Sequence, residues 1–196
     1  DLKLLELHIQ PVWLLHVLHA AERNVKKALG ARQVVVIIEK ETIPVQPTHA
    51  DSDRILQALE KILMNAVKYT PDGGTVTIRA RELPGFTDIM VVDQGIGIAS
   101  DNLPHIFDTF SALGDAALHS SGKTKFKGGG PGLGLPIAKG IIEAHGGTIW
   151  AESDGYDEAA CPGSTFHLMI PMRSGLTDDK IGDISLLDGL SQDSDS

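Results

Sequence analysis

Apolar residues recur along this chain with two periods, one close to four residues and one of two residues, so helices and strands are both predicted. The strongest helix is predicted at residues 48–69, where apolar residues follow at steps of four, three and four: Ile55, Leu59, Ile62 and Ala66. Two weaker helices are predicted at 12–29 and 133–145, each followed directly by glycine, a common residue beyond a helix C-terminus.

Short runs rich in β-branched residues predict the strands, at residues 4–12, 34–38, 75–81, 88–92, 148–152 and 165–171. Several neighbouring strands are joined by short connections, as at Pro84 and Gly85, which is typical of hairpins. The order therefore favours an α+β fold over a parallel βαβ fold. We expect a two-layer α/β sandwich with helices on one face of a mixed, mostly antiparallel sheet.

Composition narrows the functional classes. The 196 residues carry a formal charge of −9, which argues against broad binding to nucleic acid but not against a single nucleotide. Cys161 is the only cysteine, and no apolar run approaches the ~18 residues of a membrane span, so we expect a cytoplasmic location and no direct membrane insertion by this segment. The sequence leaves open whether the full-length protein is membrane-anchored. Residues 1–172 are predicted to form one domain, and the acidic, serine-rich residues 173–196 a solvated tail or linker.

One candidate site lies on the strongest predicted helix. Lys61, Asn65 and Lys68 are spaced four and three residues apart and share a face, with Tyr69 next to them. An amide oxygen suits a hard cation such as Mg²⁺, and an ammonium group suits phosphate. An ordinary amphipathic helix also has a polar stripe, so this row alone does not decide the function.

A second candidate follows the strand at 88–92, where Asp93 precedes Gly95, Gly97 and Ile98. A carboxylate at a strand end can accept a hydrogen bond from an exocyclic amine such as that of adenine, and glycine lets backbone pass close to a flat ring. A Gly-x-Gly sequence by itself is a weak signal.

A third candidate opens the last predicted helix. Its glycine-rich start presents free N–H groups and a positive dipole end, which favour phosphate, and lysines 123, 125 and 127 lie just upstream. The residues concerned are Lys127, Gly130, Gly132, Leu133, Gly134 and Leu135. A flexible linker is the alternative. Neither a Walker A motif nor a dinucleotide fingerprint fits these glycines.

Taken together, six motifs resemble, in order, those of Bergerat-fold (GHKL) ATPases of the histidine-kinase branch. They cover roughly residues 4–171 and lie at residues 65–71 (N box), 93–97 and 130–135 (glycine boxes), 106–110 (F box), 145–147 and 163–166. The resemblance implies the ATP-binding catalytic domain of a two-component sensor histidine kinase. Such a domain transfers the γ-phosphate of Mg-ATP to a histidine on a separate dimerisation hairpin, and the phosphoryl group then passes to a response regulator.

The resemblance also implies roles for individual residues. Asn65 would hold Mg²⁺, Lys68 would meet phosphate, Tyr69 would line the base pocket and Asp93 would bind the adenine amine, supported by Thr165 through water. Residues 111–131 would form a lid over ATP, and Phe107 and Phe110 would anchor that lid to the core or face the partner hairpin. His145 is expected to be structural, because a histidine at a helix end before two glycines is more often a cap.

Two residues depart from the family pattern. Lys61 replaces a second asparagine, and in the hydrolysing relatives that position carries a glutamate base, so Lys61 argues against a gyrase- or chaperone-type ATP-driven switch. Pro131 removes one N–H from the phosphate-facing loop. A degenerate nucleotide-binding scaffold therefore stays open. None of the eight histidines is followed by an acidic residue, as a phosphoacceptor would be, and residues 1–3 resemble the linker after the hairpin, so we expect that hairpin upstream.

Overall fold

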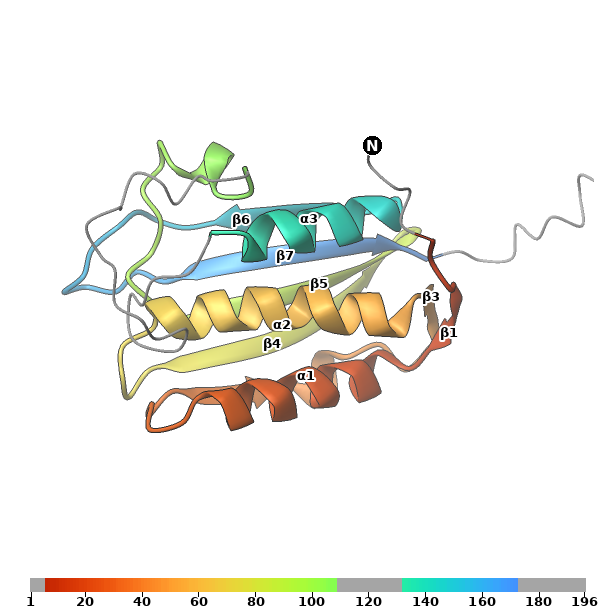
Figure 1. Cartoon of the computed structure of the whole chain (residues 1–196), viewed down its shortest axis with the longest axis horizontal. Coiled ribbons are helices and arrows are strands. Elements are labelled where there is room, and N and C mark those ends of the chain that lie inside the picture. Colours follow the sequence, from red (N-terminus) through yellow and green to blue (C-terminus); the bar gives the residue numbers. More distant parts are fainter. Residues whose placement is uncertain (1–5, 109–131, 173–196) are drawn as a thin grey trace, which may run out of the picture.

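The computed structural model describes residues 6–108 and 132–172, which form three α-helices on one face of a five-stranded sheet (Figure 1). The two-layer α+β arrangement predicted from the sequence is confirmed. The predictions for the lid, for Lys127, Gly130, Pro131 and Phe110, and for the tail at 173–196 lie outside the described residues.

The main sheet has the order β2 (Val35–Ile38), β4 (Thr75–Leu83), β5 (Phe86–Asp93), β7 (Ser164–Pro171) and β6 (Thr148–Glu152). The edge strand β2 runs parallel to β4, and the other three neighbouring pairs are antiparallel. The sheet is therefore mixed and mostly antiparallel, as predicted. On the helix-facing side, buried Ile78, Val91, Phe166 and Ile149 come from four different strands.

The helices are α1 (Leu14–Ala28), α2 (Ser52–Tyr69) and α3 (Gly134–Ala144), with α2 between the other two (Figure 1). The residues of α2 that face the core are Ile55, Ala58, Leu59, Ile62, Leu63, Ala66 and Val67. Each fully buried leucine or isoleucine contributes about 1.5–3 kcal/mol relative to an exposed one. This packing fixes the rotation of α2 and so decides which face carries its polar residues.

Two predictions at the edge of the fold are corrected. Residues 4 and 5 of the predicted strand 4–12 lie outside the described residues, and among residues 6–12 only β1 (Gln10–Val12) is a strand. Residues 48–50, predicted as helix, form strand β3 (Thr48–Ala50) antiparallel to β1. The helix begins later because Asp51 is its N-cap: the carboxylate accepts a hydrogen bond from the Arg54 N–H at 3.1 Å. Two short 3₁₀ helices, η1 (Lys40–Thr42) and η2 (Leu103–His105), were not predicted.

His145 joins the ends of two helices. Its Nδ1 lies 2.8 Å from the Ile141 carbonyl oxygen, and its Nε2 accepts a hydrogen bond from the Asp51 N–H at 3.1 Å. A single neutral tautomer satisfies both contacts. The ring thus caps α3 and attaches it to the first turn of α2, and its predicted structural role is confirmed.

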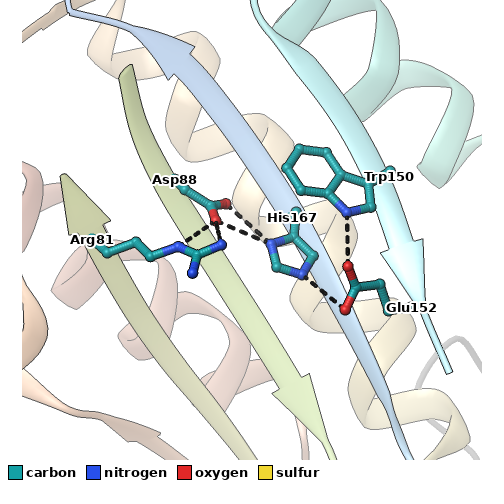
Figure 2. Close-up of polar contacts among 5 residues, drawn as sticks. All are labelled: Arg81, Asp88, Trp150, Glu152 and His167. Atoms are coloured by element: carbon teal, nitrogen blue, oxygen red, sulfur yellow. Dashed lines mark hydrogen bonds and ion pairs between the residues drawn. The ribbon is translucent and has the colours of Figure 1, made fainter. Parts of the chain in front are cut away.

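The face of the sheet away from the helices carries a cluster of polar side chains from four strands (Figure 2). Asp88, which is fully buried, accepts hydrogen bonds from Arg81 Nε at 3.0 Å and from His167 Nδ1 at 3.1 Å. Trp150 stacks on the His167 ring with centroids 4.4 Å apart, and Glu152 Oε2 lies 3.8 Å from His167 Nε2. The buried Asp88 carboxylate is therefore paired with the Arg81 guanidinium and the His167 ring on the side opposite the helices.

Candidate functional site

The polar row predicted on α2 is present. Lys61, Asn65, Lys68 and Tyr69 are all half-buried, while the opposite side of the helix fills the core. The Lys68 ammonium lies 4.9 Å from the centre of the Tyr69 ring. Within residues 6–108 and 132–172, neither the Lys61 nor the Asn65 side chain has a hydrogen bond or ion pair. Both side chains can therefore bind a ligand without breaking an existing contact there.

Asp93 ends β5 on the helix-facing side of the sheet, where its side chain is buried. Its Oδ2 accepts a hydrogen bond from the Ser164 hydroxyl at 2.6 Å, and its Oδ1 accepts one from the Gly95 N–H at 2.8 Å. Burial raises the pKa of Asp93 above its ordinary value, and the two hydrogen bonds act in the opposite direction. A carboxylate has about four acceptor positions, so Asp93 can still accept a bond from an amine.

The expected support of Asp93 by Thr165 is wrong. In the pairing of β5 with β7, Ser164 lies opposite Asp93, whereas Thr165 lies opposite Val92. Successive residues of a strand point to opposite faces, so the Thr165 side chain points away from the helices. Ser164 makes the contact directly, and no water is needed between the two side chains.

The segment Gly95–Ile98 lies close to the end of α2. A Cβ atom on Gly95 would come within 2.6 Å of both Asp93 Oδ1 and the Tyr69 carbonyl oxygen. The Ile96 N–H donates a hydrogen bond to that same carbonyl at 3.1 Å. Gly97 has a φ of 74°, and a Cβ there would overlap the Gly155 carbonyl. Only glycine fits these two close approaches.

The N-terminus of α3 faces the middle of α2. Leu133 is the N-cap residue and makes no side-chain capping bond, and the first turn, which includes Gly134 and Leu135, contains no acidic residue. The preceding Gly132 has a φ of 66°. Lys61 Cβ and Cδ lie 3.9 Å from the place a Cβ on Gly134 would occupy. A lysine stem and a helix N-terminus without an acidic cap therefore lie side by side, an arrangement that favours an anion.

Asn65 is the described residue best suited to a metal ion at this site. No group of three or more His, Cys, Asp or Glu side chains that could hold a metal occurs in the described part of the chain. Mg²⁺ commonly binds through one or two protein oxygens together with phosphate oxygens and water. The unpaired amide of Asn65 fits that mode, in which the substrate supplies the remaining ligands.

Phe107 packs in the core, edge-to-face with Phe166 at 6.3 Å between ring centroids. Phe107 was predicted to anchor the segment that follows it, and its place in the core is consistent with that role. Another residue had no sequence signal at all: the Ser153 hydroxyl accepts a hydrogen bond from the Ile98 N–H at 3.0 Å. Ser153 belongs to none of the six motifs, and 55 residues separate it from Ile98.

Residues 50–174 match the family described as histidine kinase-, DNA gyrase B-, and HSP90-like ATPases. The chain belongs to this ATPase family. Its similarity to histidine kinases is pronounced: it is 40% identical over 131 residues to the sensor histidine kinase WalK of Bacillus subtilis (strain 168), which covers 66% of this chain and 20% of WalK. The resemblance to the histidine-kinase branch of this family is thus confirmed.

Solved structures agree with this ATPase fold. The mycobacterial sensor histidine kinase MprB matches with a TM-score of 0.64 and 25% identity, over 85% of this chain and 99% of that one. The histidine kinase ThkA, in a complex with the response regulator protein TrrA, matches with a TM-score of 0.63 and 21% identity, over 85% of this chain and 42% of ThkA. At 21% identity, the ThkA match supports the fold alone.

The chain spans about a fifth of the length of WalK, so WalK has long segments with no counterpart in this alignment. Among the helices of the described residues, none combines the length and apolar character that crossing a membrane requires.

Proposed function

We propose that this ATPase-family chain is the catalytic domain of a two-component sensor histidine kinase, which transfers the γ-phosphoryl group of Mg-ATP to a histidine on a separate dimerisation hairpin. The observation that carries the proposal is that the segment after Asp93 lies against Tyr69 and the N-terminus of α3 lies against Lys61, both on the helix α2 that carries Asn65. These groups have three different chemical preferences, and ATP with Mg²⁺ satisfies all of them.

In this proposal Asp93 accepts a hydrogen bond from the adenine 6-amino group. Gly95 and Gly97 leave room for the ring, and Ile98 and Tyr69 flank it. Guanine would place a carbonyl oxygen opposite the carboxylate, so GTP should bind much more weakly than ATP. We expect a dissociation constant for Mg-ATP between micromolar and millimolar, or about −8 to −4 kcal/mol.

The triphosphate is held at the other end of the site. Lys68 and the N–H groups at the start of α3 contact phosphate oxygens, and Lys61 lies beside that helix start. Asn65 holds Mg²⁺, which neutralises charge on the phosphates. Lys127 and Gly130, on the segment before α3, are assigned to the same phosphates by the family resemblance.

The transfer needs positioning and electrostatic stabilisation more than acid–base chemistry. A histidine nitrogen on the hairpin forms the new N–P bond, and the bond from the γ-phosphorus to the bridging oxygen breaks, with ADP as leaving group. This chain orients the nucleotide and balances its charge, and the hairpin supplies the nucleophile. In this proposal a response regulator then receives the phosphoryl group; the structurally similar histidine kinase ThkA forms a complex with the response regulator protein TrrA.

Phosphotransfer from labelled ATP tests the proposal. The chain alone should stay unlabelled, because none of its eight histidines has the acidic neighbour of a phosphoacceptor. Adding the dimerisation hairpin of its full-length protein should give label on the hairpin that is stable in base and lost in acid. Asn65→Ala should prevent this labelling.

Each other outcome identifies a different function. ATP binding without hairpin labelling would favour the nucleotide-binding scaffold, and rapid hydrolysis with no acceptor would favour the gyrase- or chaperone-type switch. Absence of ATP binding would refute the site itself.

A further inference from the structure

The connection between β6 and β7, residues 153–163, packs against the glycine segment that follows Asp93. Its backbone makes two hydrogen bonds to that segment: the Gly163 N–H donates to the Gly95 carbonyl at 2.9 Å, and the Asp157 N–H donates to the Ile96 carbonyl at 2.9 Å. On its other side the segment is bonded to the end of α2 through the Tyr69 carbonyl. Gly95–Ile98 is therefore held between α2 and this connection.

Within the described residues, Ser153 also joins these two segments through its side chain. Its Oγ accepts a hydrogen bond from the Ile98 N–H at 3.0 Å, and its own proton can go to the Gly163 carbonyl at 2.7 Å or to the Gly155 carbonyl at 3.0 Å. The same oxygen lies 3.0 Å from the place a Cβ on Gly97 would occupy. One hydroxyl thus joins both ends of the connection to Ile98.

We propose that Ser153 is a positioning residue for nucleotide binding: its hydroxyl holds Gly97 and Ile98 in the place that the adenine ring requires, without contacting the nucleotide. The inference rests on the proposed function, because it assigns Gly95–Ile98 to the base pocket. Gly97 has no side chain with which to hold its own position, and its positive φ lets the chain turn at this point. After this turn the Ile98 N–H points toward the β6–β7 connection, where the Ser153 hydroxyl accepts its hydrogen bond.

The mechanism predicts how binding energy is lost when the hydroxyl is removed. In Ser153→Ala, Ile98 loses its acceptor and the connection loses the bond to Gly163, so the glycine segment samples more positions before the base binds. The cost falls on the adenine end of the ligand. ADP and ATP should therefore lose affinity by the same factor, whereas removing a phosphate-binding lysine should weaken ATP more than ADP.

The test compares Ser153→Ala with Ser100→Ala. Ser100 is exposed, and among the described residues its hydroxyl contacts only Asp101, at 3.5 Å, so it is a control for the loss of a serine hydroxyl near the same segment. Affinities for Mg-ADP and Mg-ATP are measured by calorimetry, and amide hydrogen exchange is measured by NMR without nucleotide. Ser153→Ala should lose affinity for both nucleotides by about five- to tenfold, the size expected for one or two neutral hydrogen bonds. Exchange at Ile98 should accelerate while exchange at core residues Ile89 and Leu168 stays at the wild-type rate, and Ser100→Ala should change neither property.

Three results would overturn the inference. Unchanged affinity for both nucleotides would show that Ser153 does not position the pocket. Acceleration at Ile89 and Leu168 equal to that at Ile98 would show general destabilisation instead of local positioning. Failure of the wild type to bind either nucleotide would refute the proposed function as well, whereas normal wild-type binding with no effect of Ser153→Ala would refute this inference alone.

Discussion

Replacing Asp93 by asparagine should separate nucleotide binding from folding stability. The substitution keeps the size of the side chain but removes a buried negative charge that accepts hydrogen bonds from Ser164 and Gly95. An asparagine oxygen can still accept from the Gly95 N–H, and the Ser164 hydroxyl can rotate to accept from the new amide. The protein contacts can therefore be rebuilt, whereas the acceptor for an adenine amine becomes neutral.

The expected magnitudes follow from this difference. Hydrogen bonds to charged groups contribute about 1.5–3 kcal/mol and neutral ones about 0.5–1.5 kcal/mol, so Asp93→Asn should weaken ATP binding by roughly 1–3 kcal/mol. This corresponds to an increase of about 5- to 150-fold in the dissociation constant. Burial raises the pKa of Asp93, which shows that the buried charge is unfavourable to the fold. The free energy of unfolding at pH 7 should consequently stay the same or increase in the variant.

Asp88→Asn is the matched control. Asp88 is also a buried aspartate of β5, but it lies on the opposite face, bonded to Arg81 and His167 (Figure 2). Neutralising it leaves the Arg81 guanidinium without its carboxylate and weakens the hydrogen bond to His167. Because Arg81 is half exposed and screened by water, we expect a loss of about 1–3 kcal/mol in the free energy of unfolding. ATP affinity should not change.

Calorimetric titration with Mg-ATP and Mg-GTP, together with urea unfolding, measures both quantities for the two variants. Asp93→Asn should lose ATP affinity and also reduce the preference for ATP over GTP, while Asp88→Asn should lose only stability. Unchanged ATP affinity in Asp93→Asn would remove Asp93 from the base pocket. Equal losses of affinity in both variants would mean that ATP binding depends on overall stability. The assignment of binding to the Asp93 face and of stability to the Asp88 face would then be wrong.

Two further predictions concern charge at the site. Lys61→Met should weaken ATP binding by about tenfold and ADP binding by less, because the lysine stem lies beside the N-terminus of α3. The difference between the two nucleotides should shrink as salt is added. Tighter ATP binding in this variant would show instead that Lys61 opposes Mg²⁺ binding. Because the pKa of Asp93 is raised, the folded state binds the Asp93 proton more tightly than the unfolded state does. The stability that this protonation contributes is fully present below the ordinary pKa of 3.8 and is lost as the pH rises through the raised pKa. The unfolding free energy of Asp93→Asn minus that of the wild type, from urea melts between pH 4 and 8, should therefore increase with pH, and a flat difference would contradict the assigned shift.

The sequence predicted best those features that depend on neighbouring residues. The polar row Lys61, Asn65 and Lys68 follows directly from helical periodicity, and the packing of α2 places it as expected. The boundary at Asp51 was missed because residues 48–50 have no periodicity of their own. Their strand conformation comes from pairing with β1, almost forty residues earlier in the chain.

The errors at the site have the same origin. Two adjacent hydroxyl residues, Ser164 and Thr165, follow Gly163, and only the register of β7 against β5 decides which of them meets Asp93. A shift of one residue exchanges the faces of a strand, so no local pattern could choose between them. The role of Ser153 could not be predicted from the sequence for a similar reason: only the folded β6–β7 connection brings Ser153 next to its partner Ile98.

The pairing of β5 with β7 also bears on the order in which the molecule folds. Hairpin β4–β5 closes across Pro84 and Gly85, a short loop with little entropic cost. The contact between Asp93 and Ser164 instead closes a loop of 71 residues at the far end of the β5–β7 ladder. Contacts of such high sequence separation are slow to form, since their loop entropy is lost before any contact compensates for it. The proposed adenine acceptor is therefore assembled only when β5 and β7 pair, and a chain without that pairing has helices and a hairpin but not this site.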